Sequence, residues 1–340
     1  MSSKSYEPGL TLDTGTLANG VLDGNRRALA QAITLVESTR DDHRVAASDL
    51  LQQLIPHSGH SIRLGISGVP GVGKSTFIEA LGNHVIDAGH RVAVLTVDPS
   101  SAISGGSILG DKTRMELLSR RDEAYIRPSP SGNTLGGVTR RSREALIVCE
   151  AAGYDVVIVE TVGVGQSETR VADMTDMFLL LLLPGGGDEL QGIKRGIMEL
   201  ADLVLINKAD DEMQALAGRS VADYANALRL LHPRTVDWKV EVQACSARDG
   251  LGIAEAWETV LRHHDVLEAN GQLELRRAAQ ARDWMWSEVN DSLIAALQND
   301  PEVRRQIPVL EAAASAGEIP PAIAAGQLLE IFLKHQEPSD

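Results

Sequence analysis

The amino-acid sequence predicts an α/β protein with a mainly parallel sheet covered by helices on both faces, extended by helical segments at both ends. Short apolar segments alternate with helix-like segments from residue 61 to residue 264, whereas strand-like segments disappear after that point. The longest apolar run, Met177–Leu183, has seven residues and ends at a proline. Alternation implies parallel βαβ units with right-handed crossovers. Continuous apolar strands indicate a sheet buried on both faces.

The N-terminal region, residues 1–60, is predicted to be an arm followed by helices. Residues 1–20 are polar and rich in glycine, which favours a loose arm. The sequence is helix-like from about residue 24 to residue 55. Here Leu29, Ile33 and Val36 follow one another at three-to-four spacing, as on one face of an amphipathic helix.

Residues 61–264 contain the alternating pattern. The expected strands are the apolar runs Ile62–Ser67, Val92–Val97, Val156–Glu160, Met177–Leu183, Leu203–Ile206 and Val240–Ala244. The expected helices are Lys74–Ala88, Arg140–Ala152, Asp188–Leu200, Glu212–Leu231 and Ile253–Arg262. A glycine follows each of the first two helices, as is common at helix ends.

Residues 265–340 are predicted to be a helical extension. Residues 272–298 form one long helix-like segment, and Pro301 separates it from two shorter ones around Val309–Ala314 and Ala322–Lys334. Trp286, Val289, Leu293 and Leu297 share one face of the long helix. This face either packs on the chain's own domain or forms a dimerisation arm, and the pattern alone leaves both interpretations open.

Composition excludes several classes of function. The 340 residues carry a net charge of −15, which argues against binding to nucleic acid or to an anionic membrane. The seven-residue apolar run is too short to span a bilayer, and the N-terminus lacks the pattern of a signal peptide. Cys149 and Cys245 are the only cysteines and lack metal-ligand spacing. We therefore expect a soluble cytoplasmic protein with reduced thiols.

A phosphate-binding loop stands between the first expected strand and its helix. The pattern G-x-x-x-x-G-K-S runs from Gly68 to Ser75, so the fold is predicted to be that of a P-loop NTPase. Backbone N–H groups and the helix N-terminus would hold the phosphates, Lys74 would reach the β- and γ-phosphates, and Ser75 would bind Mg²⁺. The residues expected to contact nucleotide are Gly68, Pro70, Gly71, Val72, Gly73, Lys74, Ser75 and Thr76.

A second motif predicts that the base is guanine. Asn207-Lys208-Ala209-Asp210 directly follows the strand Leu203–Ile206 and matches N-K-x-D. Asp210 offers two acceptors for the N1–H and N2–H₂ donors of guanine, whereas adenine would leave the carboxylate unpaired. Lys208 would lie over the base and Asn207 would tether neighbouring loops. Ser246-Ala247-Arg248, one strand later, would meet guanine O6 through backbone N–H groups. The expected ligands are GTP and GDP.

Two carboxylates at strand ends are candidates for metal binding. Asp98 follows Val92–Val97, and Glu160 ends its strand and opens the segment Glu160-Thr161-Val162-Gly163. Ligands of parallel α/β sheets lie beyond the carboxyl ends of the strands, so both side chains are expected near the phosphates. Capping or ordering a loop is the alternative role. Gly163 suits a backbone contact with the γ-phosphate. Gln166 is the candidate for positioning water, and its displaced position predicts slow intrinsic hydrolysis.

Several longer strings resemble the methylmalonyl-CoA mutase-associated GTPases of the MeaB/MMAA type, metallochaperone-like P-loop GTPases, from about residue 25 to 335. The matching strings are Asp98–Ser101, Gly105–Met115, Arg127–Pro130, Leu135–Gly137 and Glu160–Glu168.

This resemblance implies a GTPase that acts as the chaperone of an adenosylcobalamin-dependent mutase. Such a protein gates cofactor loading and protects or reactivates the mutase, and it forms a homodimer partly through C-terminal helices. The implied Mg²⁺ ligands are Ser75, Asp98, Asp111 and Glu160. The glycine-rich loop Gly185–Lys194, which could also be a plain strand-to-helix connection, would be an additional switch in which Lys194 couples nucleotide state to the mutase.

Two other functions compete with this interpretation. One is a nucleotide-dependent kinase of a lysine/arginine/ornithine transport system, a label attached to the same family, although no substrate pocket is evident. The other is a protein-targeting GTPase, which would need a methionine-rich apolar domain that the seven methionines do not supply. Val69 replaces a lysine that many related dimeric P-loop proteins carry, and no His- or Cys-rich tract suits metal delivery.

Overall fold

The computed structural model describes residues 13–38, 40–97, 115–128, 135–161, 167–185, 195–230 and 234–336. The chain divides into two compact units, Met1–Gln280 and Ala281–Asp340. The functional domain limits expected from the sequence, 1–60, 61–264 and 265–340, remain a proposal.

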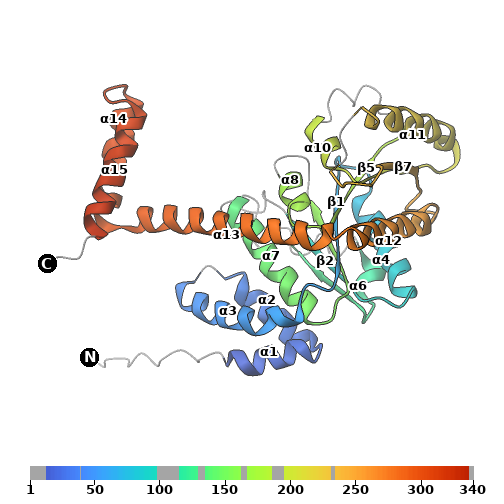
Figure 1. Cartoon of the computed structure of the whole chain (residues 1–340), viewed down its shortest axis with the longest axis horizontal. Coiled ribbons are helices and arrows are strands. Elements are labelled where there is room, and N and C mark those ends of the chain that lie inside the picture. The colour runs from blue at the N-terminus through green and yellow to red at the C-terminus, as the bar shows by residue number, and fades with distance from the viewer. Residues whose placement is uncertain are drawn as a thin grey trace. The chain divides into compact units, whose positions relative to one another are not determined.

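A seven-stranded, all-parallel sheet forms the centre of the first unit (Figure 1). Its strand order is β3-β2-β4-β1-β5-β6-β7. The strands are β1 (Ile62–Gly68), β2 (Val92–Val97), β3 (Ala124–Arg127), β4 (Val156–Thr161), β5 (Met177–Leu182), β6 (Leu203–Ile206) and β7 (Glu241–Ala244). Every residue of β2, β4 and β5 is buried, as the apolar runs predicted.

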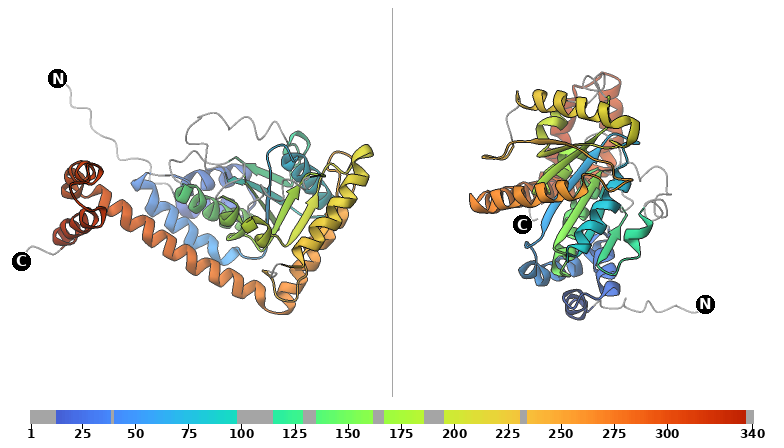
Figure 2. Two further views of the ribbon diagram at one scale, coloured as in Figure 1. Left: turned by 90° about the horizontal axis from the view of Figure 1, so that it is seen from above. Right: turned by 90° about the vertical axis from the view of Figure 1, so that its right-hand side faces the viewer.

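Helices cover both faces of this sheet (Figure 2). Those that follow the N-terminal region are α4 (Lys74–Asp87), α6 (Glu116–Ser119), α7 (Leu135–Ala151), α8 (Ser167–Ala172), α10 (Arg195–Leu200), α11 (Gln214–Leu228) and α12 (Ile253–Ala269), with a short 3-10 turn, η3, at Asp211–Met213. Side chains of α4 and α12 form one core with Leu64, Ile66 and Leu179. Leu180 and Ile206 point to the opposite face, where they pack with residues of α10 and α11. The predicted P-loop NTPase architecture is confirmed.

The N-terminal region contains more helix than the sequence predicted. It comprises α1 (Thr14–Leu22), α2 (Arg26–Val36), α3 (Asp41–Leu54) and the 3-10 turn η1 (Ile55–His57). The expectation of a loose arm through residue 20 was therefore wrong from residue 14 onward. Asp13 caps α1 by accepting a hydrogen bond from the Thr16 N–H. A Cβ on Gly20 would lie 2.8 Å from Ala28, so the glycine that suggested a loop instead permits close helix packing.

Strand β3 was also missed. It has four residues, ends in Arg127, and pairs only with β2 at the edge of the sheet. A segment this short, with a charged end, has no clear apolar run. The Arg127 guanidinium pairs with Glu37 at the end of α2, so the edge strand is also joined to the N-terminal helices.

The second unit consists of helices. α13 (Gln272–Asn299) crosses the division between the units, and α14 (Pro301–Ser315) and α15 (Pro321–Gln336) follow. Asp300 caps α14 and Pro301 occupies its first turn, so the proline that was expected to interrupt the helices begins one. Trp286 and Leu293 of α13 are more than half exposed. Among the described residues no helix is both long and apolar enough to span a bilayer.

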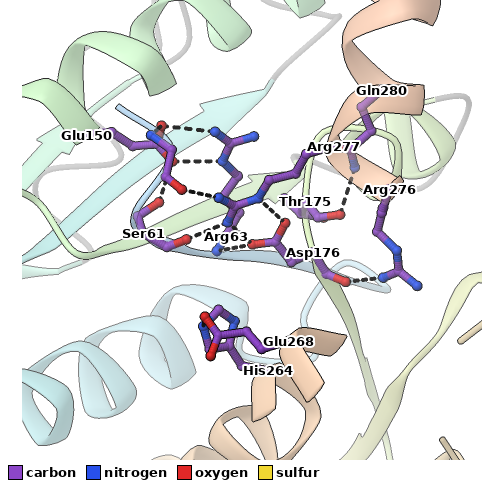
Figure 3. A network of polar contacts seen from close by, with 11 residues as sticks. Ser61, Arg63, Glu150, Thr175, Asp176, His264, Glu268, Arg276, Arg277 and Gln280 are labelled. Atoms are coloured by element: carbon purple, nitrogen blue, oxygen red, sulfur yellow. Dashed lines mark hydrogen bonds and ion pairs between the residues drawn. The ribbon is translucent and has the colours of Figure 1, made fainter. Parts of the chain in front are cut away.

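Buried ion pairs join elements near the amino ends of the strands (Figure 3). Arg63 donates from Nε and Nη2 to the two oxygens of Glu150 at 2.7 and 2.9 Å. Glu150 also accepts from the Ser61 hydroxyl at 2.5 Å and the Gly59 N–H at 2.8 Å. This carboxylate therefore has four fixed donors and holds α7 to the start of β1.

The first turns of α13 bind to the same edge. Arg277 donates from Nε and Nη2 to the two oxygens of Asp176 at 2.9 and 2.6 Å, and from Nη2 to the Ser61 carbonyl at 2.6 Å. Gln280 donates to the Thr175 carbonyl at 3.0 Å (Figure 3). The amino edge is thus stabilised by charged side chains that are paired with each other.

Candidate nucleotide site

The predicted phosphate loop connects β1 to α4 at the carboxyl edge of the sheet. A Cβ on Gly68 would lie 2.5 Å from the Leu181 carbonyl oxygen, so only glycine fits between these strands. Gly71 and Gly73 have φ angles of 79° and 92°. These left-handed conformations turn the backbone sharply before the helix. Gly73 is the N-cap of α4 and provides no side-chain cap. No side chain therefore caps the N–H groups in the first turn of this helix. These groups can then donate to a bound anion.

Lys74 extends back across this loop. Its ammonium donates to the Gly68 carbonyl at 2.7 Å, so the positive charge of Lys74 lies at the start of the phosphate loop. Ser75 is half-buried and Thr76 is exposed in the same first turn. Val72 is fully buried in the core beneath the loop and anchors it, whereas Pro70 is exposed.

Asn207 joins three segments at the carboxyl edge. Its Nδ2 donates to the Val72 carbonyl at 2.8 Å. Its Oδ1 accepts from the Ala247 N–H at 3.1 Å and from the Cys245 thiol at 3.5 Å. The side chain is 2% exposed, so these bonds are shielded from water. One amide therefore sets the positions of the phosphate loop and of the loop after β7.

The two guanine motifs lie next to each other. The Arg248 guanidinium lies 3.2 Å from Asp210 Oδ2 and also donates from Nε to Asp249 Oδ1 at 3.1 Å. Ser246 donates its hydroxyl to Asp249 Oδ2 at 3.0 Å. Lys208 is exposed and has a φ angle of 62°, a strained value for a residue with a Cβ. The hydrogen bonds of Arg248 and Ser246 hold the pKa of Asp249 below its usual value.

Glu160 lies near the carboxyl end of β4, opposite Ile66 of β1, the strand that leads into the phosphate loop. It is 3% exposed and accepts from the Thr96 hydroxyl of β2 at 3.1 Å. The next residue, Thr161, shares a 2.8 Å hydrogen bond with Ser67 of β1. The hydroxyl groups therefore connect the three neighbouring strands β2, β4 and β1 near their carboxyl ends.

The donor set of the described residues fits Mg²⁺ in kind. Ser75 and Glu160 offer oxygen atoms, which this hard cation prefers. No cluster of three or more His, Cys, Asp or Glu side chains with metal-site geometry occurs within the described part of the chain. The other residues predicted for metal binding, switching or catalysis lie outside the described residues: Asp98, Asp111, Gly163, Gln166 and Lys194.

Sequence reasoning missed two side chains at this edge. Asp249 directly follows Ser246-Ala247-Arg248, and its contact with Arg248 could have been suspected from adjacency of opposite charges. Thr96 is a polar residue near the carboxyl end of the otherwise apolar strand Val92–Val97. That position was the available signal for Thr96.

Comparisons with known proteins agree with this arrangement. The model of the family described as methylmalonyl-CoA mutase-associated GTPase MeaB matches residues 29–302. A protein of Caulobacter vibrioides described as a GTPase is 57% identical over 94% of this chain and 98% of its own length. The mitochondrial methylmalonic aciduria type A homolog of Mus musculus is 49% identical, over 93% of this chain and 79% of its own.

A solved structure agrees over the whole fold. A crystal structure described as an LAO/AO transport system kinase has a TM-score of 0.75 and 37% identity, covering 97% of this chain and 100% of that one. The GTPase ArgK of Escherichia coli is 47% identical over 83% of this chain and 86% of its own length. The match of the family model to most of the chain shows that this protein belongs to the family of methylmalonyl-CoA mutase-associated GTPases, MeaB.

Proposed function

We propose that this protein is a GTP-binding and GTP-hydrolysing chaperone of an adenosylcobalamin-dependent acyl-CoA mutase, with methylmalonyl-CoA mutase as the first candidate. Its role is to gate loading of the cofactor and to protect or reactivate the mutase. The observation that carries this proposal is the family match across residues 29–302. The geometry of the carboxyl edge supports the nucleotide-dependent part.

Each predicted residue has a role in this proposal. The N–H groups from Gly68 to Thr76 bind the phosphates, and Lys74 offsets the charge of the β- and γ-phosphates. Asp210 accepts from guanine, Lys208 covers the base, and the backbone of residues 246–248 meets O6. Ser75, Asp98, Asp111 and Glu160 would hold Mg²⁺, which neutralises phosphate charge when bound.

Hydrolysis is proposed to be slow in the isolated protein and faster with the mutase. The buried Glu160 accepts a hydrogen bond from Thr96 at the strand ends. The residues that respond to the γ-phosphate are expected just beyond it, in the candidate switch Val162–Glu168. Lys194 would pass the nucleotide state to the mutase.

The assembly is proposed to be a homodimer in the cytoplasm, formed partly by residues 265–340. The exposed apolar residues of α13 support this proposal. Trp286 and Leu293 are exposed in the single chain, and large apolar side chains that are exposed together typically mark a surface that a partner covers. Sedimentation equilibrium of the full chain tests it, and a monomer at micromolar concentration would contradict it.

The proposal is tested by mixing the protein with adenosylcobalamin-dependent methylmalonyl-CoA mutase. GTP turnover and the cofactor occupancy of the mutase are measured with and without GTP. Stimulated turnover and nucleotide-dependent occupancy are expected. Lys194→Ala should reduce stimulation while leaving the affinity for GTP unchanged. The absence of both a complex and stimulation would overturn the mutase assignment.

The kinase function is the second candidate, because the 37% identical solved structure carries that description. Both reactions cleave the γ-phosphate, so its destination separates them. With γ-labelled GTP, hydrolysis yields labelled inorganic phosphate, whereas a kinase yields a labelled protein acceptor. We expect only labelled inorganic phosphate, with or without an extract containing basic amino-acid binding proteins.

A further inference from the structure

The carboxylate proposed to recognise guanine is already paired with a cation. Arg248 lies 3.2 Å from Asp210 Oδ2. The Asp210 side chain is 19% exposed, while that of Arg248 is 66% exposed. The Asp210 carboxylate is thus partly enclosed, whereas most of the Arg248 side chain is exposed to solvent.

Arg248 has a second carboxylate within reach. Its Nε donates to Asp249 Oδ1 at 3.1 Å, and Nη2 lies 3.5 Å from Asp249 Oδ2. Ser246 holds that carboxylate in place by a 3.0 Å hydrogen bond. The guanidinium therefore bridges one carboxylate that belongs to the base site and one that lies beside it.

Guanine and the guanidinium need the same acceptor atoms. The base presents N1–H and N2–H₂ as a planar pair of donors, which matches the two oxygens of Asp210. A guanidinium presents a planar fork of donors of similar spacing. Arg248 contacts Asp210 at Oδ2. A base that donates to both oxygens in the plane of the carboxylate would compete with Arg248 for Oδ2.

We propose that Arg248 is an internal competitor of the guanine base: it pairs with Asp210 until the base enters and then keeps its contact with Asp249. The proposal deepens the nucleotide-binding part of the proposed function and depends on it. Its consequence is that Arg248 weakens the affinity for guanine nucleotides and speeds their release, because its return to Asp210 stabilises the empty site.

The expected effect is moderate because the pair is partly exposed. Ion pairs of this kind change an equilibrium by roughly two- to fivefold. Arg248→Ala is therefore expected to bind GDP about two- to fivefold more tightly, mainly through slower release. Asp249→Asn should do the opposite, because it removes a negative charge that attracts Arg248 away from Asp210, while the amide keeps a hydrogen bond with Ser246. The double variant should behave like Arg248→Ala.

The experiment uses the full chain and a fluorescent GDP analogue, with the affinity from titration and the release rate from stopped flow. Arg219→Ala, which removes another exposed arginine, is the matched control and should equal the original protein. Raising the salt concentration should shrink the difference between Arg248→Ala and the original protein, since salt screens the exposed pair.

Three results would overturn the proposal: weaker GDP binding by Arg248→Ala, which would make Arg248 a support of the site; unchanged binding; or a double variant that differs from Arg248→Ala. Asp210→Asn separates this failure from a failure of the proposed function. If that variant binds GDP as well as the original protein, Asp210 does not recognise guanine. If it binds GDP weakly while Arg248→Ala shows no gain, only the competition is rejected.

Discussion

The two edges of the sheet carry similar charged groups in different environments. At the amino edge, the Arg277–Asp176 pair has side chains that are 15% and 2% exposed. At the carboxyl edge, the Arg248–Asp210 pair has side chains that are 66% and 19% exposed. Both pairs join an arginine to an aspartate near a strand end, yet only the second can exchange one partner for a ligand.

Burial and the number of fixed donors account for this difference. Glu150 and Asp176 accept hydrogen bonds from several donors of the chain itself. Removing one partner would leave a buried charge unpaired. Asp210 is reached from solvent, where a lost partner is replaced by water at little cost. The amino edge therefore stabilises the unit, and the carboxyl edge is suited to binding.

Glu150→Ala is expected to have the largest effect, and it tests whether the amino edge stabilises the unit. The change leaves Arg63, whose side chain is 8% exposed, without its carboxylate. We expect a loss of about 3–5 kcal/mol in the free energy of unfolding, measured with urea. GDP affinity of the folded protein should not change.

Glu150→Gln is the matched control. It keeps the length of the side chain and one acceptor oxygen, so it should cost less than the alanine variant. A Glu150→Ala protein that unfolds like the original, or one that is stable but has lost GDP affinity, would contradict the division of roles between the two edges.

Asp210→Asn tests the binding edge and should have the next largest effect. Replacing one acceptor oxygen by an NH₂ group loses a charge-assisted hydrogen bond to the base and adds a clash of donors. The affinity for GDP should fall by about 2–3 kcal/mol, roughly 30- to 150-fold. The free energy of unfolding should stay within about 0.5 kcal/mol.

Asp223→Asn on α11 is the control for loss of an exposed carboxylate and should change neither quantity. If Asp210→Asn lowered stability as strongly as GDP affinity, Asp210 would belong with the structural carboxylates.

Local sequence patterns predicted the carboxyl edge better than the amino edge. The phosphate loop and the segment Asn207–Asp210 each occupy a few consecutive residues at a strand end, so spacing alone located them. The Arg277–Asp176 pair joins residues 101 positions apart, and no local pattern reports such a contact. α1 was missed because glycine and polar residues surround its few buried side chains, and β3 because four residues hold no clear periodicity.

Asp202→Asn should alter the acid stability of the amino edge. Asp202 precedes β6 and accepts from the Phe178 N–H at 2.9 Å and the Thr235 hydroxyl at 3.0 Å. Burial raises the pKa of Asp202, but the neighbouring His263, whose Nε2 lies 3.6 Å from Oδ1, and the charges of two arginines outweigh burial and leave this pKa below its ordinary value.

A lowered carboxyl pKa contributes stability above the unfolded value, near pH 4, and loses it as pH falls further. Asp202→Asn should therefore be less stable at pH 7 by about 1–3 kcal/mol and should lose less on acidification from pH 4 to pH 2. Urea unfolding at several pH values measures both. Asp223→Asn should keep the full acid dependence. An equal acid dependence in Asp202→Asn would show that other carboxylates account for it.

The smallest expected effect is the reactivity of the two thiols, because neither is exposed at either edge of the sheet. Cys149 of α7 and Cys245 after β7 are 0% and 1% exposed. Burial raises the pKa of both, to about 12 for Cys245. At pH 8 the thiolate fraction is then far too small for rapid reaction. We expect no reaction of the native protein with a thiol reagent over minutes, and two thiols per chain after unfolding.

Asn207→Ala sharpens this last expectation, because Asn207 Oδ1 accepts the Cys245 thiol hydrogen and the Ala247 N–H. Loss of that amide should loosen the loop after β7 and make Cys245 react, while Cys149 stays inert. One reactive thiol would therefore mark opening of the carboxyl edge alone. Two reactive thiols would mean that the sheet opens as a whole, and the two edges would then share one stability instead of dividing structure from binding.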